Sequence, residues 1–150
     1  MHTYDEVEKL IQKYKNNGFF TGGTTEEHIK QVEKQLDVKL PEQYKWFLLN
    51  YGYGGVLGVN TEGVARNSIL TVVEETNRVR KYYKLPKNFI VIENCDEYYY
   101  CLSTENGKVF YLDVPFGLKE EATESFLEYL YKRISDREEN YEFQKEKQNK

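Results

Sequence analysis

The chain of 150 residues suits a single domain that can bury a core without disulfides or a structural metal. Its formal net charge of −4 disfavours direct nucleic-acid binding, because nucleic-acid-binding domains carry basic patches, and it permits a basic protein partner. No apolar run approaches the roughly 20 residues of a membrane span, and the acidic start "MHTYDEVEKL" is unlike a signal peptide. We therefore expect a cytoplasmic protein without a membrane partner, in which both cysteines are reduced.

Three helices are predicted in the first third of the chain. Capping boxes open the first two, Thr3 with Glu6 and then Thr24 with Glu27. Pro41 suits the first position of the third helix. The helices cover residues 3–17, 24–36 and 41–52, and their apolar side chains recur at helical spacing, at Val7, Leu10, Ile11, Tyr14, Ile29, Val32, Leu36, Tyr44, Phe47, Leu48 and Tyr51.

Short strands and turns are expected in residues 55–73. A fourth helix follows, capped by Thr71 with Glu74 and ending before Pro86. Three strands come next, and "NG" at residues 106–107 predicts a hairpin between the last two. These strands cover residues 88–94, 98–103 and 108–113, and a final helix covers residues 123–135.

This order of elements predicts an α+β fold in which helices pack on one mostly antiparallel sheet. We assign residues 1–135 to a single domain. Residues 136–150 carry five acids and four bases and are expected to form a charged tail, either an extension of the last helix or a disordered segment.

The stretch "NCDEYYYCLST", residues 94–104, brackets three tyrosines with two cysteines. The spacing of Cys95 and Cys101 matches no usual zinc pair. In a hairpin Cys101 lies opposite residue 91 while Cys95 lies in the turn, which is too far for a disulfide. We therefore interpret Cys101 as a small apolar strand residue. Strand alternation puts Tyr98, Tyr100 and Leu102 on one side and Tyr99 and Cys101 on the other, with one of the two sets in the core.

No set of residues indicates an enzyme. The glycines of "YGYGGVLG" follow a helix and lack the Lys-Ser/Thr of a phosphate loop, so they are typical of a helix end and a tight turn. The only two histidines, His2 and His28, lie in no recognisable catalytic motif. We expect neither a cofactor nor a metal.

One acidic patch differs from the solvated helix faces elsewhere. It contains Glu93, Asp96, Glu97 and Glu105 and no base, next to the tyrosines of residues 98–100. Acids with aromatic rings are typical of a surface that binds a basic protein, because charge guides approach and Tyr is enriched at interfaces. An ordinary polar hairpin end accounts for the same residues equally well.

The stretch "IKQVEKQLDVKLPEQYKWFLLNYGYGG", residues 29–55, resembles the opening signature of the SUKH superfamily. The residues that match are Leu40, Pro41, Tyr44, Phe47, Leu48, Asn50 and Gly52. Further on, "LPKNFIVIENCDEYYYCLS" and "SFLEYLYKRI" resemble the second half of the family pattern, so the similarity spans roughly residues 5–135.

The resemblance implies an immunity protein, since bacterial members mostly bind and block the toxic domain of a partner, often a nuclease. The implied partner is a cognate toxin, a nuclease with a basic cleft. The alternatives are a non-catalytic scaffold or signalling module related to cell-wall regulation, as in the yeast founder, and a small-ligand or enzymatic domain. For the contact surface we predict acids and rings at strand ends and turns, namely Tyr53, Glu62, Asp96, Glu97, Tyr99 and Asp113.

Overall fold

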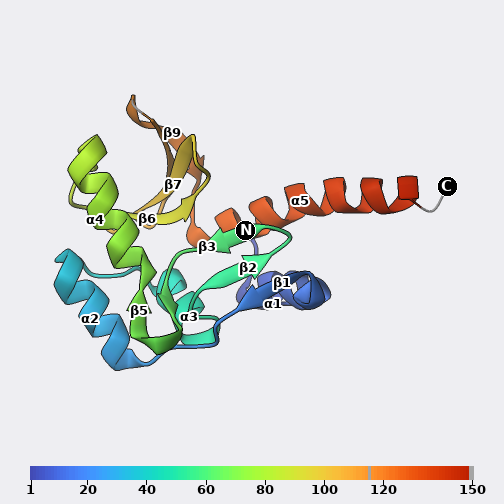
Figure 1. The fold of residues 1–150 in the computed structure, drawn as a ribbon, viewed down its shortest axis with the longest axis horizontal. Helices are drawn as coiled ribbons and strands as arrows, with labels where there is room; N and C mark the ends of the chain where they lie inside the picture. Colours follow the sequence, from blue (N-terminus) through green and yellow to red (C-terminus); the bar gives the residue numbers. More distant parts are fainter. Residues whose placement is uncertain (115, 149–150) are drawn as a thin grey trace.

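The computed structural model describes residues 1–114 and 116–148, which form five α-helices and antiparallel sheets in an α+β arrangement, as predicted (Figure 1). The helices are α1 (Tyr4–Lys13), α2 (Glu26–Leu36), α3 (Glu42–Asn50), α4 (Thr71–Tyr83) and α5 (Phe126–Gln148). The strands are β1 (Gly18–Phe20), β2 (Gly54–Val56), β3 (Val59–Thr61), β4 (Val64–Ala65), β5 (Ile69–Leu70), β6 (Phe89–Asn94), β7 (Tyr98–Ser103), β8 (Val109–Asp113) and β9 (Gly117–Thr123).

The helix starts follow local capping chemistry, with three corrections to the prediction. Pro41 is the N-cap of α3, which begins one residue later, rather than its first residue. The box at Thr3 is confirmed, since Glu6 N–H donates to Thr3 Oγ1 at 3.2 Å and Thr3 N–H donates to Glu6 Oε1 at 3.1 Å. The cap of α2 is Thr25 rather than the residue before it. Thr71 does not cap α4, because its hydroxyl bonds Gly63 instead, accepting from the N–H at 2.9 Å and donating to the carbonyl at 3.0 Å.

The strands fall into three hydrogen-bonded sheets rather than one. Their orders are β1-β2-β3, β4-β5 and β6-β7-β8-β9, with every pairing antiparallel. The first and third sheets are linked where Glu62 N–H donates to the Ile92 carbonyl at 2.7 Å. Ile92 lies at a shift of register in β6, which turns this carbonyl toward the end of β3.

The four-stranded sheet is buried on both faces. On one face Tyr100 and Leu102 belong to the main core with α5, and on the other Tyr99 and Cys101 pack with Val79 of α4. Figure 1 shows α4 and the start of α5 on opposite sides of this sheet. The expectation that only one of the two sets of side chains lies in the core was therefore wrong.

The last helix continues past residue 135 into the charged tail, for which the sequence left a helix extension and a disordered segment open. It extends to Gln148, so residues 136–148 form one helix with the preceding segment and point away from the rest of the molecule (Figure 1). Its first added turns contact α1, since the Tyr14 hydroxyl donates to Glu138 Oε2 at 2.6 Å and Lys13 Nζ lies 2.9 Å from the same oxygen. Within residues 1–114 and 116–148, no helix is at once long enough and apolar enough to cross a membrane.

Candidate protein-binding site

A hollow of about 600 Å³ lies at one end of the four-stranded sheet. Tyr98 pairs with Asp113 in the register of β7 and β8, so the turn before β7 and the end of β8 meet at the same edge. This pairing brings together three of the predicted contact residues. The hollow is lined by Asp96, Glu97, Tyr98, Asp113, Val114 and Phe116.

Backbone hydrogen bonds fix the acidic turn that forms one wall of the hollow. Asn94 Oδ1 accepts from the Asp96 N–H at 2.8 Å, and Asp96 has a φ of 67°, in the left-handed region that Asp tolerates better than most residues. Glu97 N–H donates to the Cys95 carbonyl at 2.9 Å. The turn therefore closes on itself and leaves the carboxylates of Asp96 and Glu97 exposed.

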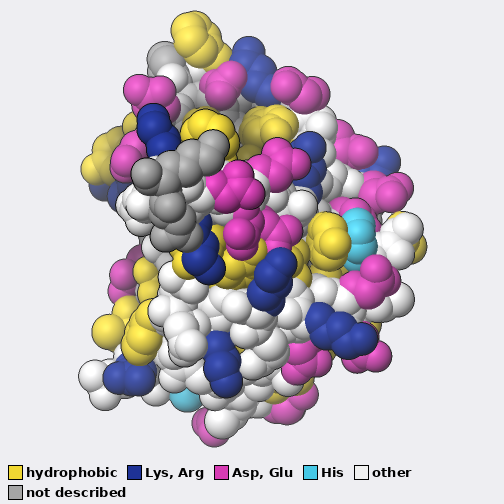
Figure 2. Space-filling view, turned by 90° about the vertical axis from the view of Figure 1, so that its right-hand side faces the viewer, with side chains coloured by type: hydrophobic (Ala, Val, Ile, Leu, Met, Phe, Trp, Pro, Cys, Tyr) yellow, Lys and Arg dark blue, Asp and Glu magenta, His cyan; other side chains and the backbone are white. Residues whose placement is uncertain are grey.

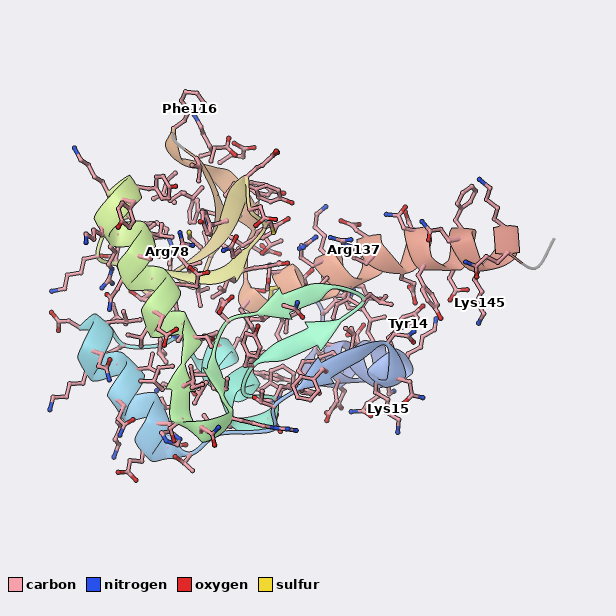
Figure 3. All side chains as sticks on the ribbon, in the orientation of Figure 1. Tyr14, Lys15, Arg78, Phe116, Arg137 and Lys145 are labelled. Atoms are coloured by element: carbon pink, nitrogen blue, oxygen red, sulfur yellow. The ribbon has the colours of Figure 1, made fainter. Side chains whose placement is uncertain are left out.

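Aromatic rings form the other side of the hollow. Tyr98 is half-buried and meets the Tyr111 ring edge to face, with centroids 6.2 Å apart. Phe116 is 77% exposed and lies at the tip of the β8–β9 connection, pointing away from the body of the molecule (Figure 3). Lys119 Nζ lies 5.5 Å from the centroid of the Phe116 ring. An exposed large apolar side chain beside carboxylates is typical of a contact surface.

Tyr53 and Glu62 line neither this hollow nor the neighbouring one described below, and form a separate half-buried pair. Burial raises the pKa of Glu62 to about 7, and the negative charges of Glu75 and Glu74 add to this rise. Burial also raises the pKa of Tyr53, with the charges of Glu62 and Glu75 acting in the same direction. These two residues and the first turns of α4 therefore lie in one acidic neighbourhood.

Tyr99 is not available as a contact residue. It is 3% exposed, and its hydroxyl accepts a hydrogen bond from Arg78 Nη2 at 3.0 Å. Figure 3 shows Arg78 on α4, next to the sheet. Because strand alternation points Tyr99 toward α4, we remove it from the predicted surface.

Glu93 does not belong to the exposed acidic patch that the sequence indicated. It is 3% exposed and forms two hydrogen bonds with Arg133, from Nε to Oε1 at 2.9 Å and from Nη2 to Oε2 at 2.5 Å. The Tyr129 hydroxyl donates to Glu93 Oε1 at 2.7 Å. The exposed acids of the turn are therefore Asp96 and Glu97.

Phe116, Tyr98 and Glu120 belong to the site, although the sequence interpretation did not select them. Glu120 lines a second hollow of about 300 Å³ together with Tyr98, Tyr111, Asp113 and Lys119. Phe116 and Glu120 were missed because β9 was not predicted, so the end of β8 had no expected neighbour. The available signal was the "FG" pair shortly after the predicted strand 108–113, since Gly is typical of turns and Gly117 has a φ of 91°.

The described residues contain neither a cluster of metal ligands nor an activated thiol. Among residues 1–114 and 116–148 no three His, Cys, Asp or Glu side chains are grouped to hold a metal ion. Burial raises the pKa of Cys95 to about 11 and that of Cys101 to about 12, so neither thiol is activated.

Figure 2 looks at the side toward which α5 points, where acidic side chains lie next to hydrophobic ones in the upper half.

Two comparisons with known proteins agree with this fold. A crystal structure of a protein from Pseudomonas syringae pv. tomato matches with a TM-score of 0.65 and 22% sequence identity, covering 84% of this chain and 95% of that chain. At this identity the likeness concerns the fold alone. Residues 7–135 match the model of the family SUKH_5, described as SMI1-KNR4 cell-wall. Because this match covers most of the sequence, the chain belongs to the SUKH_5 (SMI1-KNR4 cell-wall) family.

Proposed function

We propose that this chain is an immunity protein that binds a cognate toxin and blocks it by contact, without catalysis. Membership of the SUKH family is consistent with that role. The observation that carries the proposal is the hollow at the end of β7 and β8, where Asp96, Glu97 and Asp113 lie beside the exposed ring of Phe116. Acids around an exposed aromatic side chain provide both long-range attraction and an apolar anchor for a basic protein.

The toxin in this proposal is a secreted nuclease of the LXG type, and the protein acts in the cytoplasm. The sequence resembles the Bacillus immunity protein YobK, which is the partner of such a toxin. A nuclease must attract nucleic acid, so its cleft tends to be basic. An acidic surface with projecting rings is complementary to a basic cleft in charge and can cover it. Tyr53 and Glu62 form a second proposed contact in the same complex, next to the acids of α4.

Co-expression with the cognate toxic domain, to be sought among the genes neighbouring this one, tests the proposal. We expect the wild-type chain to protect the cells and the double variant Asp96→Lys with Glu97→Lys to lose protection. The matched control is Glu139→Lys with Glu146→Lys, two exposed positions on α5 that change the net charge by the same amount. Absence of protection by the wild-type chain would refute the immunity role, and equal protection by both variants would refute this surface.

The family description, SMI1-KNR4 cell-wall, favours one second candidate, a non-catalytic scaffold in cell-wall regulation. That role requires stable association with an endogenous, non-toxic partner. It is favoured if purification from the native host yields such a partner, identified by mass spectrometry, while co-expression with the toxic domain gives no rescue.

A further inference from the structure

The two hollows at the end of the four-stranded sheet are parts of one groove. They share Tyr98 and Asp113 as a common wall, with Asp96 and Glu97 on one side and Glu120 on the other. The charged side chains that line this groove are thus four acids, Asp96, Glu97, Asp113 and Glu120, and one base, Lys119. The groove therefore carries a net negative charge and has rings at both ends.

The protein places one cation of its own in this groove. Lys119 lines the second hollow, and its Nζ lies 5.5 Å from the centroid of the Phe116 ring in the first. A cation within about 6 Å of a ring centroid is attracted by the ring's negative face. In the free protein, the Lys119 ammonium group therefore already lies near the Phe116 ring and the acids beside it.

We infer that this groove binds an arginine-bearing segment of the partner protein, with guanidinium groups on the faces of Phe116 and Tyr98 and against the carboxylates of Asp96 and Asp113. This inference rests on the proposed function and names the chemistry of the toxin surface. The negative groove repels nucleic acid, and no metal-binding group occurs in the described part of the chain. Arginine is favoured over lysine, because its planar, weakly hydrated guanidinium stacks on rings while it binds carboxylates.

The probes are three capped peptides, hexaarginine, hexalysine and hexaglutamate, added to the full-length isotope-labelled protein and followed by NMR. We expect hexaarginine to shift the resonances of Tyr98, Tyr111 and Phe116 in a saturable manner. It should bind about two- to fivefold more tightly than hexalysine, the gain expected from exposed cation–ring contacts. Hexaglutamate should leave these resonances unchanged.

Two variants and one control distinguish binding in the groove from non-specific attraction of the cationic peptide to an acidic protein. Asp96→Asn with Asp113→Asn should weaken hexaarginine binding about fivefold, as expected for two exposed charge pairs. Glu139→Gln with Glu146→Gln on α5 changes the net charge equally and should leave the affinity unchanged. Lys119→Ala should strengthen binding, because it frees the face of the Phe116 ring and removes the one base.

Shifts spread evenly over the acidic surface, or equal affinities for hexaarginine and hexalysine, would overturn the inference. Each of these results is independent of the co-expression assay. If cells are protected but hexaarginine does not select the groove, the immunity role stands and this partner chemistry is wrong. If the groove binds hexaarginine but the toxic domain kills the cells, the immunity role is wrong and the groove has another basic partner.

Discussion

Glu93 carries a carboxylate into the interior, where two side chains bind it through three hydrogen bonds. Arg133 provides two hydrogen bonds and the opposite charge, and Tyr129 provides a third hydrogen bond. The side chains of Glu93 and Arg133 are 4% and 12% exposed. The Arg133 guanidinium also lies 5.1 Å from the centroid of the Tyr100 ring, which connects the ion pair to β7. A buried charge of this kind is tolerated only while all its partners are present.

Replacing Arg133 should therefore destabilise the fold strongly. Arg133→Met leaves the Glu93 carboxylate buried without a counter-charge, and we expect the free energy of unfolding to fall by about 3–5 kcal/mol. Adding Glu93→Gln to that variant should restore more than half of the loss, because the uncompensated charge is removed. Urea unfolding followed by circular dichroism measures both changes.

The exposed pair of Lys13 and Glu138 is the control for this experiment. Lys13 is 59% exposed, so Lys13→Met should change the free energy of unfolding by less than about 1 kcal/mol. If Arg133→Met and Lys13→Met have similar effects, the buried pair is not a significant element of stability.

Glu62 predicts a pH dependence of stability. Its pKa is about 7 in the folded protein, above the ordinary value of 4.5, so the folded state binds more protons than the unfolded state between these values. Stability from this group is fully present below about pH 4.5 and decreases as pH rises through 7. Glu62→Gln cannot ionise, so the variant should gain stability relative to the wild type from pH 5 to pH 8 in urea unfolding.

The comparison is Glu105→Gln at an exposed position, and the urea midpoints of this variant should match those of the wild type at pH 5 and at pH 8. A Glu62→Gln difference that is the same at pH 5 and pH 8 would show that the carboxyl group of Glu62 does not titrate in this window.

At the scale of elements, α4 covers the free edge of β6 with a side-chain hydrogen bond. Val91 N–H donates to Thr76 Oγ1 at 2.9 Å, and both residues are fully buried. One residue further along, the Ile92 carbonyl accepts from Glu62 N–H. The backbone groups of β6 that face away from β7 at its bulge are thus satisfied by a helix and by the end of β3.

Thr76→Val tests how α4 is held on the sheet. The change keeps the shape of the side chain but leaves a buried N–H unpaired, and we expect unfolding free energy to fall by about 2 kcal/mol. Thr76→Ser keeps the hydroxyl and loses one methyl group, for a loss of about 1 kcal/mol. Chemical denaturation of the two variants shows which of them loses more unfolding free energy. A larger loss for the serine variant would show that packing of the methyl group outweighs the hydrogen bond.

The elements also show which segments sequence patterns reveal. Residues 98–103, "YYYCLS", were predicted as a strand because a short aromatic and apolar run lies between turn signals. The sequence of β9, "GLKEEAT", carries three consecutive charged residues and no alternation. Such a segment is stable as an edge strand because β8 alone supplies its partner groups, and its charges discourage pairing with another chain. This requirement for a partner strand cannot be seen in the segment itself.

At the scale of the whole molecule, helices cover both faces of the four-stranded sheet. With α4 on one face and α5 on the other, the turn before β7 and the connection after β8 remain open at its end (Figure 1). At this end Phe116 therefore stays exposed, Tyr98 packs only partly against the core, and no helix neutralises the acids. The position of the proposed binding surface follows from this layering.

The sequence by itself determined the α+β class, the five helices, the three central strands and the family, because these depend on local periodicity, turn residues and the order of motifs. It also predicted that Asp96 and Glu97 are exposed, since both lie in a short polar turn. Only the tertiary structure decided that Glu93 is buried against Arg133 and that Tyr99 is covered by α4. Burial of a strand side chain depends on which distant element packs on its face, and that choice is made only when the whole chain is assembled.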